Sequence, residues 1–264
     1  LSRTGVALFS SSLDHVGPFA RSVRDIAITF DSLQGTDERD PICTKRRPEL
    51  CFPQLDRGID GLRIAVADDY FAKGAEPKAL EAVSKVTQAL DVTQSIAIPE
   101  AHRARAAAYI ITASEGANLH FANLRSRPQD FDPATRDRFL AGALIPAHWY
   151  LQAQRFRQWY RDRVREIFQN VDIILAPTTP CVAPPIGQEK MVIAGEEVLV
   201  RPNLGLYTQP LSFIGLPVLS VPVHLPGCLP LGVQIIASPY NEALILRVAA
   251  VLEAQEIVSA PVVP

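Results

Sequence analysis

Apolar residues recur along the chain in two patterns, which alternate from one end to the other. A spacing of three to four residues places side chains on one face of a helix, and short continuous apolar runs are typical of buried strands. The first pattern predicts helices at 23–33, 78–90, 101–124, 133–143 and 147–169, with a closing helix around 244–252. The second predicts strands at 62–67, 92–98, 171–177, 217–223 and 231–237, with a hairpin at 190–201.

The order of these elements predicts an α/β fold with a mixed β-sheet covered by helices. A strand, a helix and a second strand follow one another over 62–98, which is the order of a parallel crossover. The runs 172–177, 217–223 and 231–237 are continuously apolar, so we expect them to be central strands with both faces covered.

Composition narrows the possible functions. The 264 residues amount to one large domain or two small ones, and 48% are hydrophobic. A formal net charge of -2 indicates no nucleic-acid surface, and no apolar run reaches the roughly 18 residues of a membrane span. The first ten residues resemble no secretory signal, and the four cysteines form no C-x-x-C pair. We therefore expect a cytoplasmic protein with free thiols, no metal and no cofactor.

The segment SSLDHVGPFARSVRD at 11–25 gathers the groups of a possible catalytic device. His15 lies beside Asp14 and follows three serines at 10–12. They could form a serine triad, if one of the hydroxyls reached the imidazole with the carboxylate behind it. Neighbours in an extended loop point apart, however. The alternative is a turn in which Asp14 or Ser12 binds local backbone amides.

Two further segments have both a functional and a structural interpretation. Arg157, Arg161 and Arg165 form a stripe that could bind phosphate or RNA, or could be a solvated helix face. APTTP at 176–180 follows a strand and could line a pocket or form a proline turn. Neither S-x-x-K, G-x-S-x-G nor a glycine-rich phosphate loop occurs, so the residues alone supply no complete catalytic device.

Four segments, at 2–25, 172–180, 207–223 and 229–237, resemble the amidase signature family in the order of that family. The resemblance implies the amidase signature fold and amide hydrolysis by a Ser-Ser-Lys triad. The elements that carry this triad in the family precede the point where this sequence begins. Residues 1–264 are thus expected to be the C-terminal part of a single amidase domain, without catalytic residues and inactive alone.

Within that family, the sequence resembles the branch that hydrolyses carboxybiuret and biuret. Where the glutamine-using component of tRNA-dependent amidotransferases has an aspartate for the ammonium of glutamine, this chain has Gly205. Arg127 replaces a tyrosine of that component, whereas Arg138 matches its substrate-binding arginine. The resemblance implies a small ureido substrate bound by residues of this chain, namely Arg138, Thr178, Thr179 and Gln209. It also implies a small helical partner subunit. Association of the chain with itself is a further expectation.

Three alternatives remain open at this point. Arg138 could instead form an ion pair with Asp132 or Asp137 on a helix surface. The chain could be a catalytically dead remnant that serves as an interaction module. It could also be the glutamine-using component of a tRNA-dependent amidotransferase, although Gly205 and the acidic net charge disfavour this.

Overall fold

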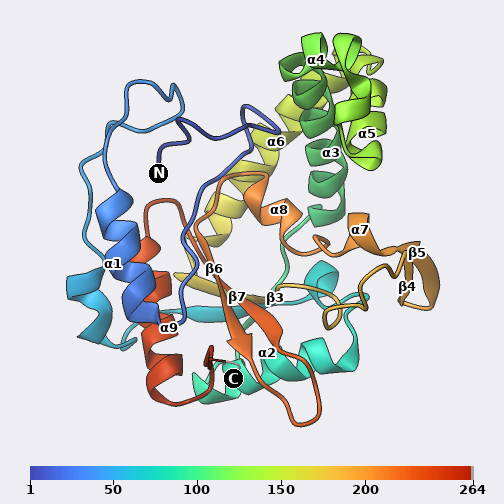
Figure 1. The fold of residues 1–264 in the computed structure, drawn as a ribbon. Helices are drawn as coiled ribbons and strands as arrows, with labels where there is room; N and C mark the ends of the chain where they lie inside the picture. The colour runs from blue at the N-terminus through green and yellow to red at the C-terminus, as the bar shows by residue number, and fades with distance from the viewer. Residues whose placement is uncertain (263–264) are drawn as a thin grey trace.

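The computed structural model describes residues 1–262 and contains two sheets (Figure 1). The strands are β1 (Ile64–Ala67), β2 (Ser95–Ile96), β3 (Ile173–Pro177), β4 (Lys190–Ile193), β5 (Glu196–Leu199), β6 (Val218–Val223) and β7 (Leu231–Ala237). Five of them form the main sheet in the order β2-β1-β3-β7-β6, and β4 pairs with β5 in a hairpin. β1 lies parallel to β2 and β3, whereas β7 is antiparallel to β3 and β6. The predicted parallel crossover and the mixed sheet are confirmed.

The helices follow the predicted pattern closely. They are α1 (Val23–Leu33), α2 (Pro77–Ala89), α3 (Ala101–Leu119), α4 (Phe121–Ser126), α5 (Pro133–Ala143), α6 (Ala147–Ile167), α7 (Val200–Asn203), α8 (Gln209–Ser212) and α9 (Glu242–Ala254). Three short 3₁₀ helices are η1 (Phe52–Arg57), η2 (Asp69–Phe71) and η3 (Pro128–Asp130). α1 begins where Ser22 accepts a hydrogen bond from the Asp25 amide.

The helix expected at 101–124 is broken in two at His120. The backbone of His120 leaves the helical region with φ -102° and ψ 11°. Its Nε2 atom lies 2.8 Å from the Leu8 carbonyl oxygen, and its ring stacks on Phe139. Contacts with distant segments therefore override the local helical pattern at this residue.

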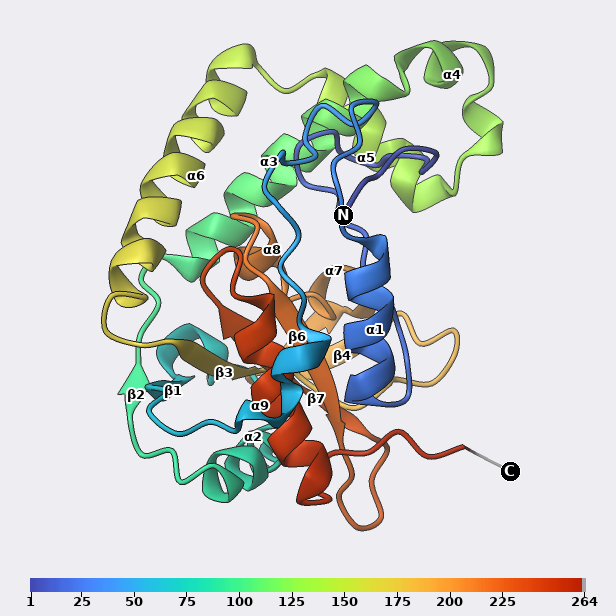
Figure 2. The same ribbon diagram turned by 90° about the vertical axis from the view of Figure 1, so that its left-hand side faces the viewer.

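Helices cover both faces of the main sheet. One core cluster joins α1, α2 and α9 to the side chains of Ile173 and Leu175. The other joins α3, α6 and α8 to Ile174 and Ala176 of the same strand. Consecutive residues of β3 thus point into opposite clusters, which explains its continuous apolar run. Figure 2 shows α6 running beside α3, with α4 and α5 beyond the sheet.

The expectation that 217–223 is a central strand is wrong for the part of the chain that the structure describes. β6 pairs with β7 on one side, and no other described strand pairs with it. Ser220 in its middle is exposed. The apolar side chains of β6 are therefore only partly buried by residues 1–262. β3 and β7 are central strands, as predicted.

Candidate functional site

Helix α3 carries the polar side chains around which the candidate site is built. Its small residues Ala104 and Ala108 are buried in the same core cluster as Ile174 of β3. Arg105 and Glu115 lie on other sides of the helix and contact separate segments. Two polar regions result, one around the carboxylate and one around the guanidinium.

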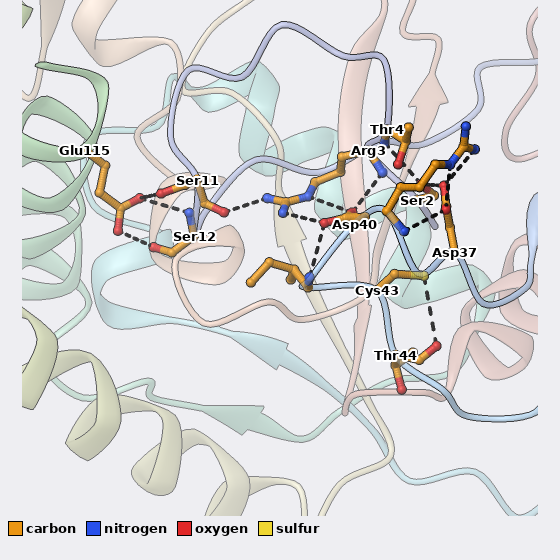
Figure 3. A network of polar contacts seen from close by, with 12 residues as sticks. Ser2, Arg3, Thr4, Ser11, Ser12, Asp37, Asp40, Cys43, Thr44 and Glu115 are labelled. Atoms are coloured by element: carbon orange, nitrogen blue, oxygen red, sulfur yellow. Dashed lines mark hydrogen bonds and ion pairs between the residues drawn. The ribbon is translucent and has the colours of Figure 1, made fainter. Parts of the chain in front are cut away.

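Glu115 is a buried carboxylate that accepts several hydrogen bonds from the segment beginning at residue 10 (Figure 3). It accepts from the hydroxyl of Ser10 at 2.5 Å and from the amide and hydroxyl of Ser12 at 2.9 and 2.6 Å. The phenol of Tyr150 donates from 3.0 Å. Burial would raise the pKa of Glu115, but these donors outweigh it and hold the pKa below its ordinary value.

A second buried charge anchors the same segment. Arg3 and Asp40 form an ion pair with 2.8 Å between Nη2 and Oδ1, and both residues are buried. Nη1 of Arg3 also donates to the Ser11 carbonyl oxygen at 2.7 Å (Figure 3). Hydrogen bonds from Arg3 hold the pKa of Asp40 well below its usual range. The serines after residue 9 are thus tied to two fixed carboxylates, one directly and one through Arg3.

The possible triad of Asp14 and His15 with one of the serines at 10–12 is not assembled. Asp14 accepts from the backbone amide of Ser10 at 3.1 Å, so it forms the local turn that was the alternative. Ser12 donates to Glu115, and no hydrogen bond joins His15 to a serine among residues 1–262. Burial lowers the pKa of His15, which favours a neutral imidazole.

Arg157 does not lie on a solvated helix face, which was one of the two interpretations of the arginine stripe. Its Nε donates to the Phe213 carbonyl oxygen at 2.7 Å, and its Nη2 donates to the Ser12 carbonyl oxygen at 3.0 Å. The side chain is half-buried, and burial lowers its pKa. Arg157 therefore links α6 to α8 and to the serine segment.

Arg138 on α5 is a half-buried cation held by aromatic rings. The centre of its guanidinium lies 4.3 Å from the Tyr109 ring centroid and 5.1 Å from that of Phe9. Nη2 donates to the hydroxyl of Thr112, whereas the buried Nε has no partner. Burial lowers the pKa of Arg138. The guanidinium is thus oriented but not neutralised by these contacts.

The two carboxylates that could have paired with Arg138 are engaged elsewhere. Asp132 pairs with Arg201 at 2.9 Å, and Asp137 pairs with Arg136 at 3.0 Å. Within residues 1–262, no carboxylate lies within 4.0 Å of the Arg138 guanidinium. The surface ion pair expected as an alternative is therefore absent from the described part of the chain.

Gln209 at the start of α8 is held by Arg105 of α3. Nε of Arg105 donates to Oε1 of Gln209 at 3.0 Å. Nη2 of Arg105 donates to the Pro202 carbonyl oxygen at 2.8 Å and to Oδ1 of Asn203 at 2.9 Å. All three partners of Arg105 are neutral, so its charge also lacks a direct counterion.

Two adjoining cavities open between these side chains. The larger, of about 510 Å³, is lined by Phe9, His102, Arg105, Ala106, Tyr109, Ala134, Thr135, Arg138, Arg201, Pro202 and Gln209. The smaller, of about 230 Å³, shares Arg138 and Gln209 and also reaches Asp14 and Ser212. No carboxylate lines the larger cavity, although two of the arginines on its wall have no acidic partner.

The two threonines expected in the substrate pocket lie apart from Arg138. Thr178 and Ser220 have their hydroxyls 2.8 Å apart and line a third cavity of about 480 Å³ with His15. Ser212 lines both this cavity and the smaller one described above, so the two are neighbours. Thr179 instead donates to the carbonyl oxygen of Cys181 in its own loop. The structure thus brings together Arg138 and Gln209, and places Thr178 in the next cavity.

Sequence reasoning missed Arg105 and Glu115, for different reasons. Glu115 interrupts a run of small residues, ITASEGAN, and a lone charge in such a run was a usable signal of a buried acceptor. Arg105 had no such signal, because it alternates with Arg103 in a stretch that is typical of an exposed helix face. In the described part of the chain, no group of three His, Cys, Asp or Glu side chains is placed to hold a metal ion. No helix there has the length and apolarity to cross a bilayer.

The amino-acid sequence of the chain is similar to those of several known proteins. A family model described as Amidase matches residues 1–246. The chain is 47% identical over 256 residues to AtzE, a component of the 1-carboxybiuret hydrolase of Pseudomonas sp. (strain ADP), and the match covers 96% of this chain and 56% of that protein. It is 34% identical to a component of the glutamyl-tRNA(Gln) amidotransferase of Roseiflexus sp. (strain RS-1), over 94% of this chain and 55% of that protein. The chain therefore spans little more than half the length of these relatives.

Solved structures share the fold. One, described as an unexpected vestigial protein complex that reveals the evolutionary origins of an s-triazine catabolic enzyme, superposes with a TM-score of 0.96 at 45% identity. It covers 99% of this chain, which corresponds to 58% of that one. The corresponding glutamyl-tRNA(Gln) amidotransferase component of Thermotoga maritima superposes with a TM-score of 0.81 at 26% identity, over 96% of this chain and 55% of that one.

Proposed function

The chain belongs to the amidase signature family, and we propose that it forms the C-terminal part of an amidohydrolase that acts on a small ureido carboxylate. Its similarity to a component of 1-carboxybiuret hydrolase supports a substrate of the carboxybiuret kind. In this proposal the chain supplies substrate-binding residues and no nucleophile.

The observation that carries the proposal is the environment of Arg138. Its guanidinium lines a cavity without a carboxylate, beside the amide of Gln209. A half-buried cation without a counterion is costly, and a carboxylate of the substrate would supply the missing partner with two charge-assisted hydrogen bonds. Thr178 and Thr179 are proposed to complete the pocket from the β3 end, with Thr178 the better placed of the two.

Gly205 supports a ureide over glutamine as the substrate. A Cβ atom built on Gly205 would lie 3.3 to 3.5 Å from the side chain of Gln209, so glycine leaves room for that amide. With glycine at this position and no carboxylate on the wall of the larger cavity, the ammonium group of an amino acid would find no acidic partner there. The amidotransferase alternative therefore has less support, despite the 34% identity to a component of such an enzyme.

We place the Ser-Ser-Lys triad in residues that precede this chain in the whole protein, within one amidase domain that continues through residues 1–264. There the lysine would act through the bridging serine to deprotonate the nucleophile. Two observations support this. The chain spans 56% of the related 1-carboxybiuret hydrolase component, and no strand among residues 1–262 pairs with the outer edge of β6. The similar solved complex supports a partner subunit, which we propose to be small and helical.

Ammonia release by the full protein that contains this chain tests the proposal. We expect turnover of carboxybiuret, and Arg138→Leu should raise its KM by about 10- to 100-fold, the value of a charge-assisted pair. Arg136→Leu, two residues earlier on α5 and bound to Asp137, is the matched control and should leave KM unchanged. No turnover of any amide by the full protein would favour the catalytically dead remnant.

The 264-residue chain alone is expected to release no ammonia from biuret, carboxybiuret or simple amides. No serine hydroxyl among residues 1–262 is hydrogen-bonded to a lysine or histidine that could activate it. Turnover that disappeared in Ser11→Ala, Ser12→Ala or His15→Ala would contradict this and restore the local triad.

A further inference from the structure

Arg105 faces the same cavity as Arg138 and is the second cation there without an acidic partner. The third arginine on the cavity wall is compensated, because Arg201 pairs with Asp132 at 2.9 Å. Two uncompensated guanidiniums therefore remain on the wall of a cavity of about 510 Å³.

The smaller adjoining cavity does not neutralise them. Asp14 is the one acidic residue on its wall, and Oδ2 of Asp14 accepts from the backbone amides of Phe9 and Ser10. Asp14 therefore bonds within its own loop, and no ion pair joins it to Arg105 or Arg138 among residues 1–262. An anion from outside the chain is the partner that the two arginines lack.

The open hydrogen-bonding groups of Arg105, Arg138 and Gln209 in the cavity wall are donors. Arg105 has only donors, so Gln209 must turn Oε1 toward it, and that acceptor is then occupied. Nε2 of Gln209 and Nη1 of both arginines have no hydrogen-bond partner among residues 1–262. A ligand bound by these three side chains must bring acceptors.

We propose that Arg105 is a second specificity-determining residue, which forms with Arg138 and the Gln209 amide a site that binds a carboxylate with an adjacent carbonyl and rejects an ammonium group. The inference rests on the proposed function only for the identity of the substrate. Arg105 acts in two ways. Its charge attracts the anion, and its hydrogen bond fixes Gln209 with the NH₂ group free to donate.

Rejection of a cation follows from the same geometry. An ammonium group brings three donors and a positive charge to a wall on which two guanidiniums are already positive and without a counterion. The ammonium group and the guanidiniums would repel each other, because all are positive. The donors of the arginines would also stay unsatisfied, because an ammonium group has no acceptor. The selection is therefore by charge and by hydrogen-bond polarity together.

Titration calorimetry on the full protein tests this with three inert compounds of equal length, malonate, 1,3-propanediol and 1,3-diaminopropane. Malonate should bind, whereas the diol and the diamine should bind at least about tenfold more weakly. Arg105→Leu should weaken malonate binding by about 10- to 100-fold, as loss of a charge-assisted pair does. Arg105→Lys keeps the charge but cannot form the forked hydrogen bonds of a guanidinium. Its affinity for malonate should lie between those of the unmodified protein and Arg105→Leu.

Arg103→Leu is the matched control. Arg103 lies two positions before Arg105 on α3, is exposed and pairs with Glu100, and it lines neither cavity. Its loss should leave malonate binding unchanged. Equal weakening by Arg103→Leu and Arg105→Leu would reduce the effect to general charge and overturn the proposal. So would equal binding of malonate and 1,3-diaminopropane.

The outcome is separable from that of the proposed function. Malonate binding that depends on Arg105, in a full protein that hydrolyses no amide, would support this site and contradict the hydrolase. Hydrolysis of carboxybiuret with malonate binding unaffected by Arg105→Leu would support the hydrolase and overturn the role of Arg105.

Discussion

Two charged regions extend from helix α3, and they differ in whether the charge is satisfied. Around Glu115, one buried carboxylate accepts from three serines and a tyrosine. Around Arg105 and Arg138, two guanidiniums face a cavity and have only neutral partners. In the first region the chain itself satisfies the charge, whereas in the second some hydrogen-bond donors of the arginines have no partner among residues 1–262.

The difference separates a structural network from a binding site. A buried charge with all its hydrogen bonds made stabilises one arrangement of the chain, and here it anchors the serine segment to α3 and α6. A charge left without a counterion costs stability, and a ligand that supplies the counterion recovers that cost as binding free energy. Changes in the two regions should therefore act on different quantities.

The largest expected loss of stability comes from the core that supports both regions. Ile174 is fully buried in β3, in the cluster that includes the buried face of α3. Ile174→Ala should lower the free energy of unfolding by about 2 to 5 kcal/mol, because it leaves a cavity. Denaturant unfolding of the full protein measures this, with exposed Val192→Ala in the hairpin as the control. A change no larger than that of the control would place Ile174 outside the core.

Glu115→Ala should have the next largest effect. It leaves the Ser10 and Ser12 hydroxyls without their acceptor, which costs about 1 to 3 kcal/mol of unfolding free energy. Glu197→Ala, which removes an exposed partner of Lys190, should cost far less in the same denaturant experiment. If the two variants lost equal stability, the Glu115 network would not be the anchor described above.

The contribution of Glu115 should disappear at low pH. Its pKa in the folded protein lies below the ordinary value of 4.5, so the unfolded chain takes up the proton first as pH falls. The stabilisation is complete above about pH 4.5 and is lost as pH falls through the folded pKa. We expect the stability gap between the unmodified protein and Glu115→Gln to be smaller below pH 4.5 than at about pH 6. A gap that widened over this range would contradict the sign of the shift.

The smallest stability change is expected at Arg138. Arg138→Met should alter the unfolding free energy by less than about 0.5 kcal/mol, because the lost contacts with Tyr109 and Phe9 are offset by removal of an uncompensated charge. The same variant should bind malonate far more weakly. A stability loss as large as that of Glu115→Ala would make Arg138 structural and remove the contrast between the two regions.

The sequence by itself determined the elements and the family. Apolar runs such as IILA at 173–176 and the helical spacing in 147–169 identified β3 and α6, because the spacing of apolar residues is a local property of the sequence. The ordered segments also indicated the amidase signature family, which the comparisons confirm. Local patterning failed at His120, where a bond to Leu8 and stacking on Phe139 end a helix that the sequence would continue.

Only the tertiary structure decided which polar residues act together. Arg105 and Gln209 are 104 positions apart in sequence, and Ser12 and Glu115 are 103 apart. Their pairing depends on how α3 packs against α8 and the N-terminal segment, which no pattern within either stretch encodes. The same reason separates Thr178 from Arg138, although the resemblance to the family had assigned both to one pocket. Hydrophobic patterning is a property of neighbours along the chain, whereas the compensation of a charge depends on neighbours that folding alone brings together.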